Sequence, residues 1–265
     1  MTSAVPSDPG QGHGHTLLSI ALRAASAGAQ VLEAGAEDLG IESKDGTGNI
    51  VTTVDIAAER AVRQVLEQAR PGDQITGEEL EATVPATAPT DIRWSVDPLD
   101  GTANYACGLP HFATSVAAID VRTGRWLLGV VSAPLLDTTY FALRGNGAYS
   151  RRPGQQARRI HAGTGHRPRL LGTGLSYDAA LRTWQWARLG SLLADYDDIR
   201  CLGSAALGLC EAARGALAGF VESDLYEHDW AAGALIAEEA GLVVTRPSTF
   251  RGGISALDAH GVDHE

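Results

Sequence analysis

The chain has 265 residues, of which 44% are hydrophobic and 20% charged, a composition typical of a globular protein that buries a sizeable core. Its 32 acidic residues outnumber its 21 lysines and arginines and give a net charge of −11. This excess argues against a protein that coats nucleic acid or binds membrane surfaces. No apolar stretch approaches the roughly 18 residues of a membrane span. The first fifteen residues also lack the basic and apolar regions of a secretory signal.

The three cysteines, Cys107, Cys201 and Cys210, are an odd count without a C-x-x-C spacing. That pattern disfavours a disulfide framework and a structural zinc site, and it suits the reducing cytoplasm. We therefore expect a cytoplasmic protein whose partners include neither nucleic acid nor a membrane.

The first half of the chain predicts two helices followed by strands. Residues 1–15 are rich in Gly, Pro, Ser and His, and we expect a disordered tail there. Apolar residues then recur at helical spacing over 17–36 and over 55–70, where a Pro-Gly pair ends the pattern. After a loop at 81–91, strand patterns follow at 92–96, 112–119, 126–132 and 138–143. The last strand enters the Gly-Asn-Gly turn at 145–147, which indicates a hairpin.

The second half alternates strands and helices. It begins after 151–169, which contains six arginines and no acidic residue and which we interpret as a connection. Strands are predicted at 170–175, 199–202, 217–222 and 242–245. Helices are predicted at 179–193, 204–214 and 229–240. The pattern is lost after Pro247. We therefore expect layered α/β architecture with an N-terminal half (16–150), a C-terminal half (151–247) and a poorly patterned tail (248–265).

The most informative segment is Trp94-Ser-Val-Asp-Pro-Leu-Asp-Gly-Thr102. Its apolar strand delivers Asp97 at the C-terminal end, where ligands gather in open α/β sheets. Asp100 follows three residues later, so both carboxylates can face one divalent cation or two bridged cations. Pro98 stiffens the turn, and Gly101 lets the backbone approach an anion. This pattern favours a metal that holds a phosphate, and the structural alternative is a simple turn capped by Asp.

Extended to Tyr105, this segment resembles the first signature of the inositol monophosphatase superfamily, W-x-x-D-P-[IL]-D-G-T-x-N-[FY]. The stretch 229–241 is similar to the second signature. Shorter motifs of the family occur in the expected order at 44–55, 77–79 and 200–206. The resemblance, over about 17–245, implies an αβαβα sandwich with mixed sheets and a homodimer. It also implies hydrolysis of phosphate monoesters by a metal-activated water, with two or three Mg²⁺ per active site and no covalent enzyme intermediate.

The resemblance implies roles for individual residues. The implied metal ligands are Glu78, Asp97, the Leu99 carbonyl, Asp100 and Asp229. The phosphate would be held by Gly101 and Thr102. Glu78 and the Thr102 hydroxyl would orient the attacking water, and Asp55 would support Thr102 from behind. The alcohol part of the substrate would meet Asp100, Gly203, Ser204, Ala205, Glu222 and His228.

Several of these residues also have structural alternatives. Asp55 and Asp229 stand where helices begin and would serve there as caps, while Glu222 ends a predicted strand and would face solvent. His228 occupies a position where the second signature usually has Trp. Its alternatives are an ordinary surface histidine and a polar contact to a sugar or imidazole. We therefore expect residues 222–228 to determine which substrate binds.

The superfamily includes enzymes with different small substrates. An inositol monophosphate-like substrate is the first choice for this chain, because the A-A-G and E-A-G runs are present and Glu222 precedes Asp229 by seven residues. Histidinol phosphate and nucleoside or sugar monophosphates are the alternatives, and the arginines of 151–169 favour nucleotides if they do not simply lie in a solvated loop. A regulatory interaction protein on the same scaffold is a hypothesis of another class. Such a protein would be free to lose the metal ligands, which this chain retains.

Overall fold

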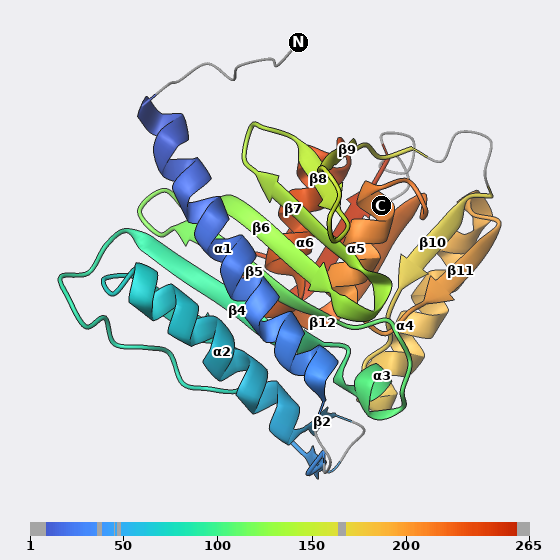
Figure 1. Cartoon of the computed structure of the whole chain (residues 1–265). Coiled ribbons are helices and arrows are strands. Elements are labelled where there is room, and N and C mark those ends of the chain that lie inside the picture. The colour runs from blue at the N-terminus through green and yellow to red at the C-terminus, as the bar shows by residue number, and fades with distance from the viewer. Residues whose placement is uncertain (1–8, 36–38, 45, 47–48, 164–167, 259–265) are drawn as a thin grey trace.

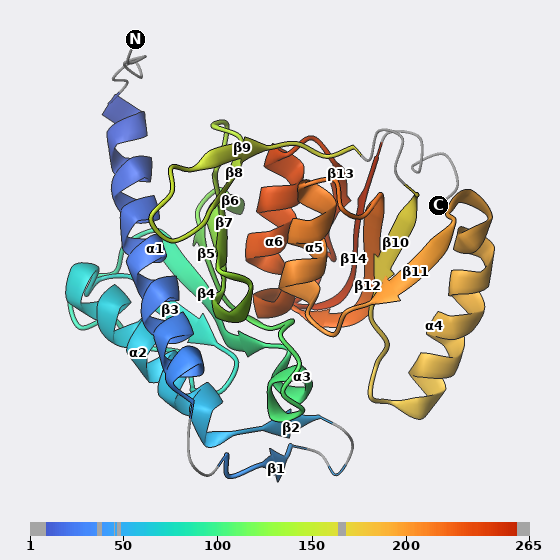
Figure 2. The same ribbon diagram turned by 45° about the vertical axis from the view of Figure 1, so that its right-hand side comes forward.

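A computed structural model describes residues 9–35, 39–44, 46, 49–163 and 168–258. Figure 2 shows its elements in layers. Helices α1 (Pro9–Ala34) and α2 (Thr53–Ala69) cover a seven-stranded sheet, and α5 (Ala205–Ala213) and α6 (Glu227–Glu239) separate it from a five-stranded sheet. Helix α4 (Ala179–Leu192) lies outside the second sheet. The layered α/β fold with mixed sheets is therefore confirmed.

The larger sheet has the strand order β3-β4-β5-β6-β7-β8-β9, and only β3 and β4 run parallel. Its strands are β3 (Gln74–Gly77), β4 (Ile92–Asp100), β5 (Ala113–Asp120), β6 (Arg125–Ala133), β7 (Thr138–Leu143), β8 (Ala148–Arg151) and β9 (Arg158–Ile160). The four predicted strands and the hairpin are confirmed, whereas β3 was not predicted. Strand β9 lies inside the arginine-rich stretch, so this stretch is partly the edge of the sheet and not only a connection.

The smaller sheet has the order β11-β10-β12-β14-β13. Its strands are β10 (Leu170–Thr173), β11 (Asp198–Cys201), β12 (Gly219–Tyr226), β13 (Val243–Thr245) and β14 (Arg251–Leu257). Strand β14 corrects the expectation that the pattern ends at Pro247, because it pairs antiparallel with both β12 and β13. The glycines at 252 and 253 hide the strand pattern in the sequence, while residues 254–257 are buried.

Helix α1 also starts earlier than the apolar pattern predicts. It begins at Pro9, a residue that suits the first turn of a helix, so residues 9–15 are helical where a disordered tail was expected. Figure 1 shows this beginning of α1 extending beyond the sheet that the helix covers. Residues 1–8 lie outside the described residues. The remaining short elements are β1 (Glu42–Ser43), β2 (Ile50–Val51), α3 (Thr102–Ala106) and the 3₁₀ turns Pro134–Leu136 and Leu193–Asp195.

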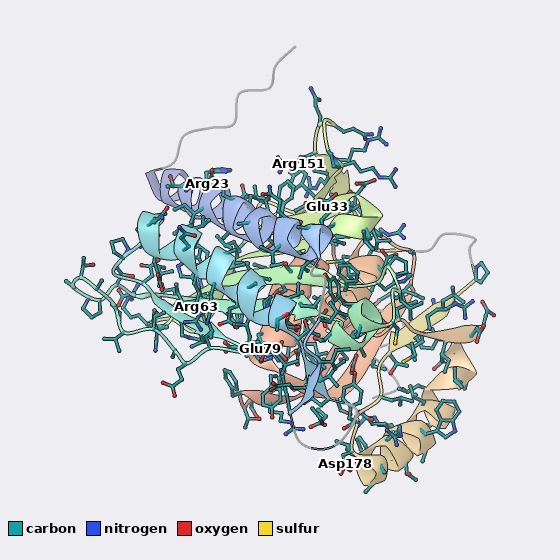
Figure 3. All side chains as sticks on the ribbon, turned by 60° about the horizontal axis from the view of Figure 1, so that its bottom comes forward. Arg23, Glu33, Arg63, Glu79, Arg151 and Asp178 are labelled. Atoms are coloured by element: carbon teal, nitrogen blue, oxygen red, sulfur yellow. The ribbon has the colours of Figure 1, made fainter. Side chains whose placement is uncertain are left out.

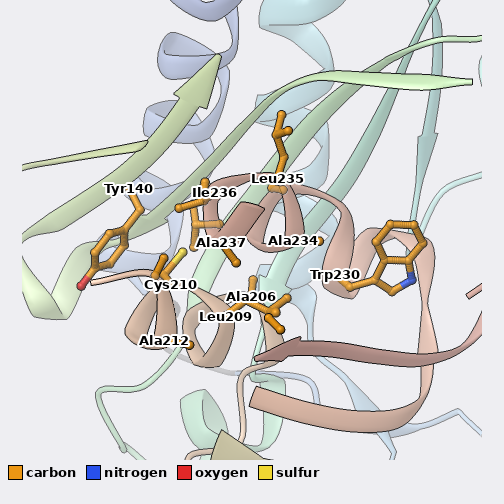
Figure 4. Packing of buried hydrophobic residues seen from close by; sticks show 14 of the residues in the cluster. Tyr140, Ala206, Leu209, Cys210, Ala212, Trp230, Ala234, Leu235, Ile236 and Ala237 are labelled. Carbon is orange, nitrogen blue, oxygen red and sulfur yellow. The ribbon is translucent and has the colours of Figure 1, made fainter. Parts of the chain in front are cut away.

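The largest apolar cluster lies between the two sheets, around α5 and α6 (Figure 4). Small residues bring these elements close together. A Cβ added to Gly129 of β6 would lie 2.5 Å from the Ala232 carbonyl oxygen, and one added to Gly233 would lie 2.8 Å from Leu209 Cβ. The A-A-G run of the second signature is therefore packed against β6 and α5 and lies away from the cleft. The presence of this A-A-G run therefore indicates how the helices pack and does not indicate which substrate binds.

A second cluster joins α1 and α2 to the larger sheet and includes Leu17, Ala21, Ala24, Val62, Leu66, Trp94, Val116 and Val130. It buries the face of β4 that lies opposite α6 and so fixes this strand within the molecule. The three cysteines are free. None of the helices in the described part of the chain is long and apolar enough to cross a membrane.

Candidate active site

Strand β4 carries two aspartates to the centre of the molecule. It continues to Asp100, so Asp97 lies within the strand and not at its end as predicted. The register with β5 shifts between these two residues, where Pro98 has no N–H to donate to the ladder. The Leu99 N–H donates to Asp97 Oδ1 over 3.0 Å, so the local turn contact expected of an Asp is also present. Asp97 is buried, with 1% of its surface exposed.

Asp100 connects β4 to the start of α5. Its Oδ2 accepts hydrogen bonds from the Ser204 hydroxyl over 2.5 Å and from the Ala206 N–H over 2.7 Å. The Ala205 N–H donates to Oδ1 over 3.3 Å. The amides at the N-terminus of α5 thus stabilise this carboxylate at one end of the cleft. Ser204 is buried and holds Asp100, so it does not line the cleft as the resemblance implies.

The loop after β3 presents Glu78, and α2 determines its path. Glu59 of α2 is fully buried and accepts the Glu79 N–H over 2.8 Å and the Arg63 Nε–H over 2.7 Å. A Cβ at Gly77 would lie 2.0 Å from Glu59 Oε1, so the loop can approach this carboxylate only with glycine there. The position of Glu78 therefore depends on a buried ion pair.

Arg63 completes this support. Its guanidinium donates to the carbonyl oxygens of Leu80 and Glu81 over 2.8 and 2.9 Å. Figure 3 labels Arg63 on α2 and Glu79 near the same helix. Three backbone groups of the loop are thus tied to two side chains of one helix.

Lys44 pairs with both acids of this loop. Its Nζ lies 2.6 Å from Glu78 Oε1 and 2.6 Å from Glu79 Oε1. Burial raises the pKa of Glu79 to about 7, helped by the charge of Glu78. Burial also opposes ionisation of Glu78, but the nearby His228 and Lys44 outweigh it and lower the pKa of that carboxyl. Glu78 is therefore ionised in the cleft.

Hydrogen bonds of Thr102 and Asp55 connect α3 to the start of α2. The Thr102 hydroxyl lies 2.9 Å from Asp55 Oδ1 and 3.0 Å from the Leu99 carbonyl oxygen, both acceptors. The other oxygen of Asp55 accepts from the N–H and the hydroxyl of Thr52 over 2.9 and 2.5 Å. The N-cap of α2 is Thr52, and Asp55 is the N3 residue of its capping box, so Asp55 is not the N-cap that its structural alternative predicts. The same carboxylate also supports Thr102. It is fully buried behind Thr102.

Asp229 and His228 come from the first turn of α6. Asp229 Oδ2 accepts the Tyr226 N–H over 2.6 Å, so Asp229 is the N3 residue that bonds back to the N-cap Tyr226 and is not itself the predicted N-cap. The His228 Nε2 lies 3.4 Å from Asp229 Oδ1. The His228 ring is stacked on Tyr226, with centroids 5.6 Å apart and planes 13° apart. His228 is 8% exposed and is not a surface histidine.

These side chains meet in one cleft of about 670 Å³. The predicted site residues that line it are Glu78, Asp97, Leu99, Asp100, Gly101, Thr102, Gly203, Ala205, Glu222, His228 and Asp229. Glu222 lies within β12, so its interpretation as a solvent-facing strand end is wrong. A Cβ at Gly174 would lie 2.1 Å from Glu222 Oε1, which shows how closely the neighbouring strand end approaches this carboxylate.

A family model of the inositol monophosphatase family matches residues 14–256. The chain belongs to this family. It is 39% identical over 247 residues to a Nus factor SuhB of Pasteurella multocida, covering 91% of this chain and 88% of that protein. It is 39% identical over 211 residues to an inositol-1-monophosphatase of Mycobacterium leprae, covering 78% of this chain and 72% of that protein.

Solved structures of the family have the same fold. The extragenic suppressor protein suhB from Bartonella henselae superposes with a TM-score of 0.83 at 30% identity, over 94% of this chain and 96% of that one. An inositol monophosphatase from Anabaena gives a TM-score of 0.77 at 28% identity, over 94% and 93%. The inositol monophosphatase fold expected from the two signatures is thus confirmed.

Sequence reasoning missed several residues of the cleft of this family member. Tyr177 and Ser176 follow β10, and Asp224 and Arg251 come from β12 and β14. A signal for Tyr177 was present, because it follows the carboxyl end of a strand that runs parallel to its neighbours. Arg251 had none, since its strand was not predicted. It pairs with Asp224 and lies over the Tyr226 ring, 4.7 Å from its centroid.

The carboxylates of the cleft suit a divalent cation. Burial raises the pKa of Asp97 well above its ordinary value, and the charges of Glu78, Asp100 and Asp229 raise it further. Burial and the charge of Asp229 raise the pKa of Asp100 to about 7. Acids packed this closely repel one another, and a hard cation with oxygen ligands removes that repulsion. The donor set of this family member therefore fits a metal such as Mg²⁺.

Proposed function

We propose that the protein is a Mg²⁺-dependent phosphatase that hydrolyses a small phosphate monoester. The observation that carries this proposal is the convergence of Glu78, Asp97, Asp100 and Asp229 beside Thr102 in one cleft. These acids come from the larger sheet and from α6 of the neighbouring helix layer, and their mutual repulsion destabilises the cleft unless a cation binds there. Bound divalent cations would supply Lewis acidity and neutralise the charge that develops on the phosphoryl group.

The attacking water is oriented by this chain's own groups. Because the Thr102 hydroxyl donates its proton toward Asp55 or Leu99, its oxygen stays free to accept a hydrogen from a water. The ionised Glu78 accepts the other hydrogen and directs the oxygen of the water toward phosphorus. No residue needs to form a bond to phosphorus, because water is the nucleophile.

The phosphate and the alcohol occupy adjacent parts of the cleft. The Gly101 and Thr102 amides, at the beginning of α3, hold the phosphate oxygens, since the first amides of a helix have no partner within it. Glu222, Gly203 and Ala205 line the part of the cleft that would contact the hydroxyl groups of the alcohol, while Ser204 is buried beneath them and holds Asp100. An inositol monophosphate-like substrate is our first choice, supported by relatives named inositol-1-monophosphatase. Histidinol phosphate and nucleoside or sugar monophosphates are the alternatives. The homodimer and the cytoplasmic location remain predictions.

A regulatory function is the second candidate, because a relative with 39% identity is named Nus factor SuhB. Such a function does not require Glu78, Asp97 or Asp229 to stay together, yet all three line the cleft. Their retention supports catalysis, whether or not the protein also has a binding partner.

The test is phosphate release by the purified protein with and without Mg²⁺. The substrates are inositol monophosphate, histidinol phosphate, a nucleoside monophosphate, a sugar phosphate and a generic aryl phosphate. We expect Mg²⁺-dependent turnover that ranks the four biological substrates differently from one another. Absence of release from every substrate, by protein that binds Mg²⁺ and is folded, would contradict the proposal and favour the regulatory function.

A further inference from the structure

His228 belongs to the metal end of the cleft. One ligand atom each from Glu78, Asp97 and His228 lie within 4.8 Å of one another. Opposite ligands of one ion at about 2.1 Å are about 4.2 Å apart, so this spread is close to that of a shared coordination sphere. The imidazole is also 92% buried and is held by the stack on Tyr226, which restricts its orientation. A nitrogen donor is therefore placed among carboxylate oxygens.

The residue type adds a second, independent observation. The second signature usually has Trp at position 228, and an indole offers only an N–H donor. Imidazole offers a lone pair and is a frequent ligand of first-row transition metals, whereas Mg²⁺ prefers oxygen ligands throughout. Exchange of Trp for His thus changes the chemistry available to a cation beside Glu78 and Asp97.

We propose that His228 is a direct nitrogen ligand of a cleft cation and gives this site a selective preference for Mn²⁺ over Mg²⁺. The inference rests on the proposed function only in assuming that the cleft binds a divalent cation. Three features of the chain support it: the carboxylates of Glu78 and Asp97 supply hard oxygen ligands, His228 supplies one nitrogen, and Asp229 lies 3.4 Å from that ring. A site that combines carboxylate oxygens with an imidazole nitrogen binds a first-row transition ion such as Mn²⁺ in preference to Mg²⁺, because Mg²⁺ gains little from a nitrogen ligand.

The competing explanations are a contact to the substrate and a simple ion pair with Asp229. Neither places a nitrogen nucleus in contact with a bound ion. Pulsed electron paramagnetic resonance of the Mn²⁺-loaded full chain separates them, because a coordinated imidazole gives a ¹⁴N modulation that changes frequency when all histidines carry ¹⁵N. This measurement needs no variant and no substrate. We expect the modulation in the wild-type protein, and its absence while Mn²⁺ is bound would overturn the proposal.

Variants then assign the nitrogen. His228→Gln keeps a polar side chain and removes the imidazole, and His161→Gln is the matched control because His161 is exposed and does not line the cleft. We expect the modulation to persist in His161→Gln and to vanish in His228→Gln. Equilibrium titrations should show Mn²⁺ affinity falling about tenfold or more in His228→Gln, with Mg²⁺ affinity changing less than about threefold.

The outcomes also separate this inference from the proposed function. Persistence of the modulation in folded His228→Gln, or equal losses of Mn²⁺ and Mg²⁺ affinity, would overturn the role of His228 and leave the phosphatase untouched. If the wild-type chain binds neither ion in the titration, both proposals fail. Thermal melting of each variant establishes that it is folded, and the isotope experiment on the wild-type chain decides the question if His228→Gln is not.

Discussion

At the scale of single residues, the proposed mechanism depends most directly on the charge of Asp97. Asp97→Asn keeps the shape of the side chain and removes its charge. We expect phosphate release to fall by roughly a thousandfold or more, since each ~1.4 kcal/mol of lost transition-state stabilisation is a factor of ten. Steady-state kinetics with Mg²⁺ measure this. Because Asp97 is buried among acids that raise its pKa, the variant should melt no lower than wild type without metal.

The matched control for this substitution is Asp91→Asn, whose carboxyl side chain is 67% exposed and distant from the cleft. It should leave both turnover and melting unchanged. Near wild-type turnover by Asp97→Asn would show that the site has been assigned wrongly.

Gly101 has a backbone conformation and close contacts that only glycine accommodates. Its φ is +100°, and an added Cβ would lie 2.9 Å from the His111 carbonyl oxygen and 3.1 Å from that of Gly203. Gly108 has a φ of +72° with nothing within 4 Å of an added Cβ. In Gly101→Ala and Gly108→Ala alike, an alanine must adopt the left-handed conformation, which costs about 1–2 kcal/mol of stability. Only in Gly101→Ala does the added Cβ also clash with backbone atoms. We expect denaturant unfolding to show the larger loss in Gly101→Ala, together with loss of phosphate binding. Equal losses would refute the close-contact argument.

At the scale of elements, helix α2 positions the loop that presents Glu78. Arg63→Met would leave Glu59 charged and buried without its partner, a loss of about 3–5 kcal/mol. The control is Arg122→Met, whose ion pair with Asp91 is 3.8 Å long and exposed, and which should cost at most about 1 kcal/mol. Chemical denaturation measures both. Because the loop also loses two carbonyl contacts, Arg63→Met should weaken metal binding as well.

A double variant distinguishes the buried charge from simple loss of packing. Glu59→Gln combined with Arg63→Met removes both charges, so it should be more stable than Arg63→Met alone. If the two losses simply add, the ion pair is not what holds this loop to α2.

At the scale of the whole molecule, the acids of the cleft make stability depend on pH when no metal is bound. Asp100 has an ordinary pKa of 3.8, and in the fold burial and Asp229 raise it to about 7. The pKa values of Asp97 and Glu222 are raised too, by burial and by neighbouring acids. The folded chain therefore keeps protons that the unfolded chain releases, and this stabilisation is complete below pH ~4 and lost as the pH rises through ~7.

We accordingly expect the metal-free protein to unfold at lower temperature as the pH rises from about 5 to about 8. Saturating Mg²⁺ should reduce this loss, because a cation stabilises the ionised acids and binds only the folded chain. Calorimetry with chelator and with Mg²⁺ across this range measures the effect. Rising stability with pH in chelator would mean that the carboxylates do not repel one another as their positions imply.

The sequence by itself determined most of the framework. Periodicity of apolar residues is a local property, so it located α2, α4, α5 and β7 to within a few residues. It failed where residues are too few or too small to carry a pattern, as in β3, β9 and the glycine-containing β14. Motif order supplied the family, and with it the candidate metal ligands.

Only the tertiary structure decided how the candidate ligands are held and what else surrounds them. The contacts that position these residues join parts of the chain up to 150 positions apart. Asp100 bonds to the first amides of α5, Glu59 bonds to the loop of Glu78, and His228 lies beside Glu78 and Asp97. No local pattern records such contacts, because they arise when separate layers pack. The same packing explains why Asp55 and Asp229 each bond to the N-cap of a helix and also belong to the candidate site. At Asp55 one carboxylate oxygen bonds to Thr52 and the other to Thr102. At Asp229, Oδ2 accepts the Tyr226 N–H and Oδ1 lies 3.4 Å from the His228 Nε2.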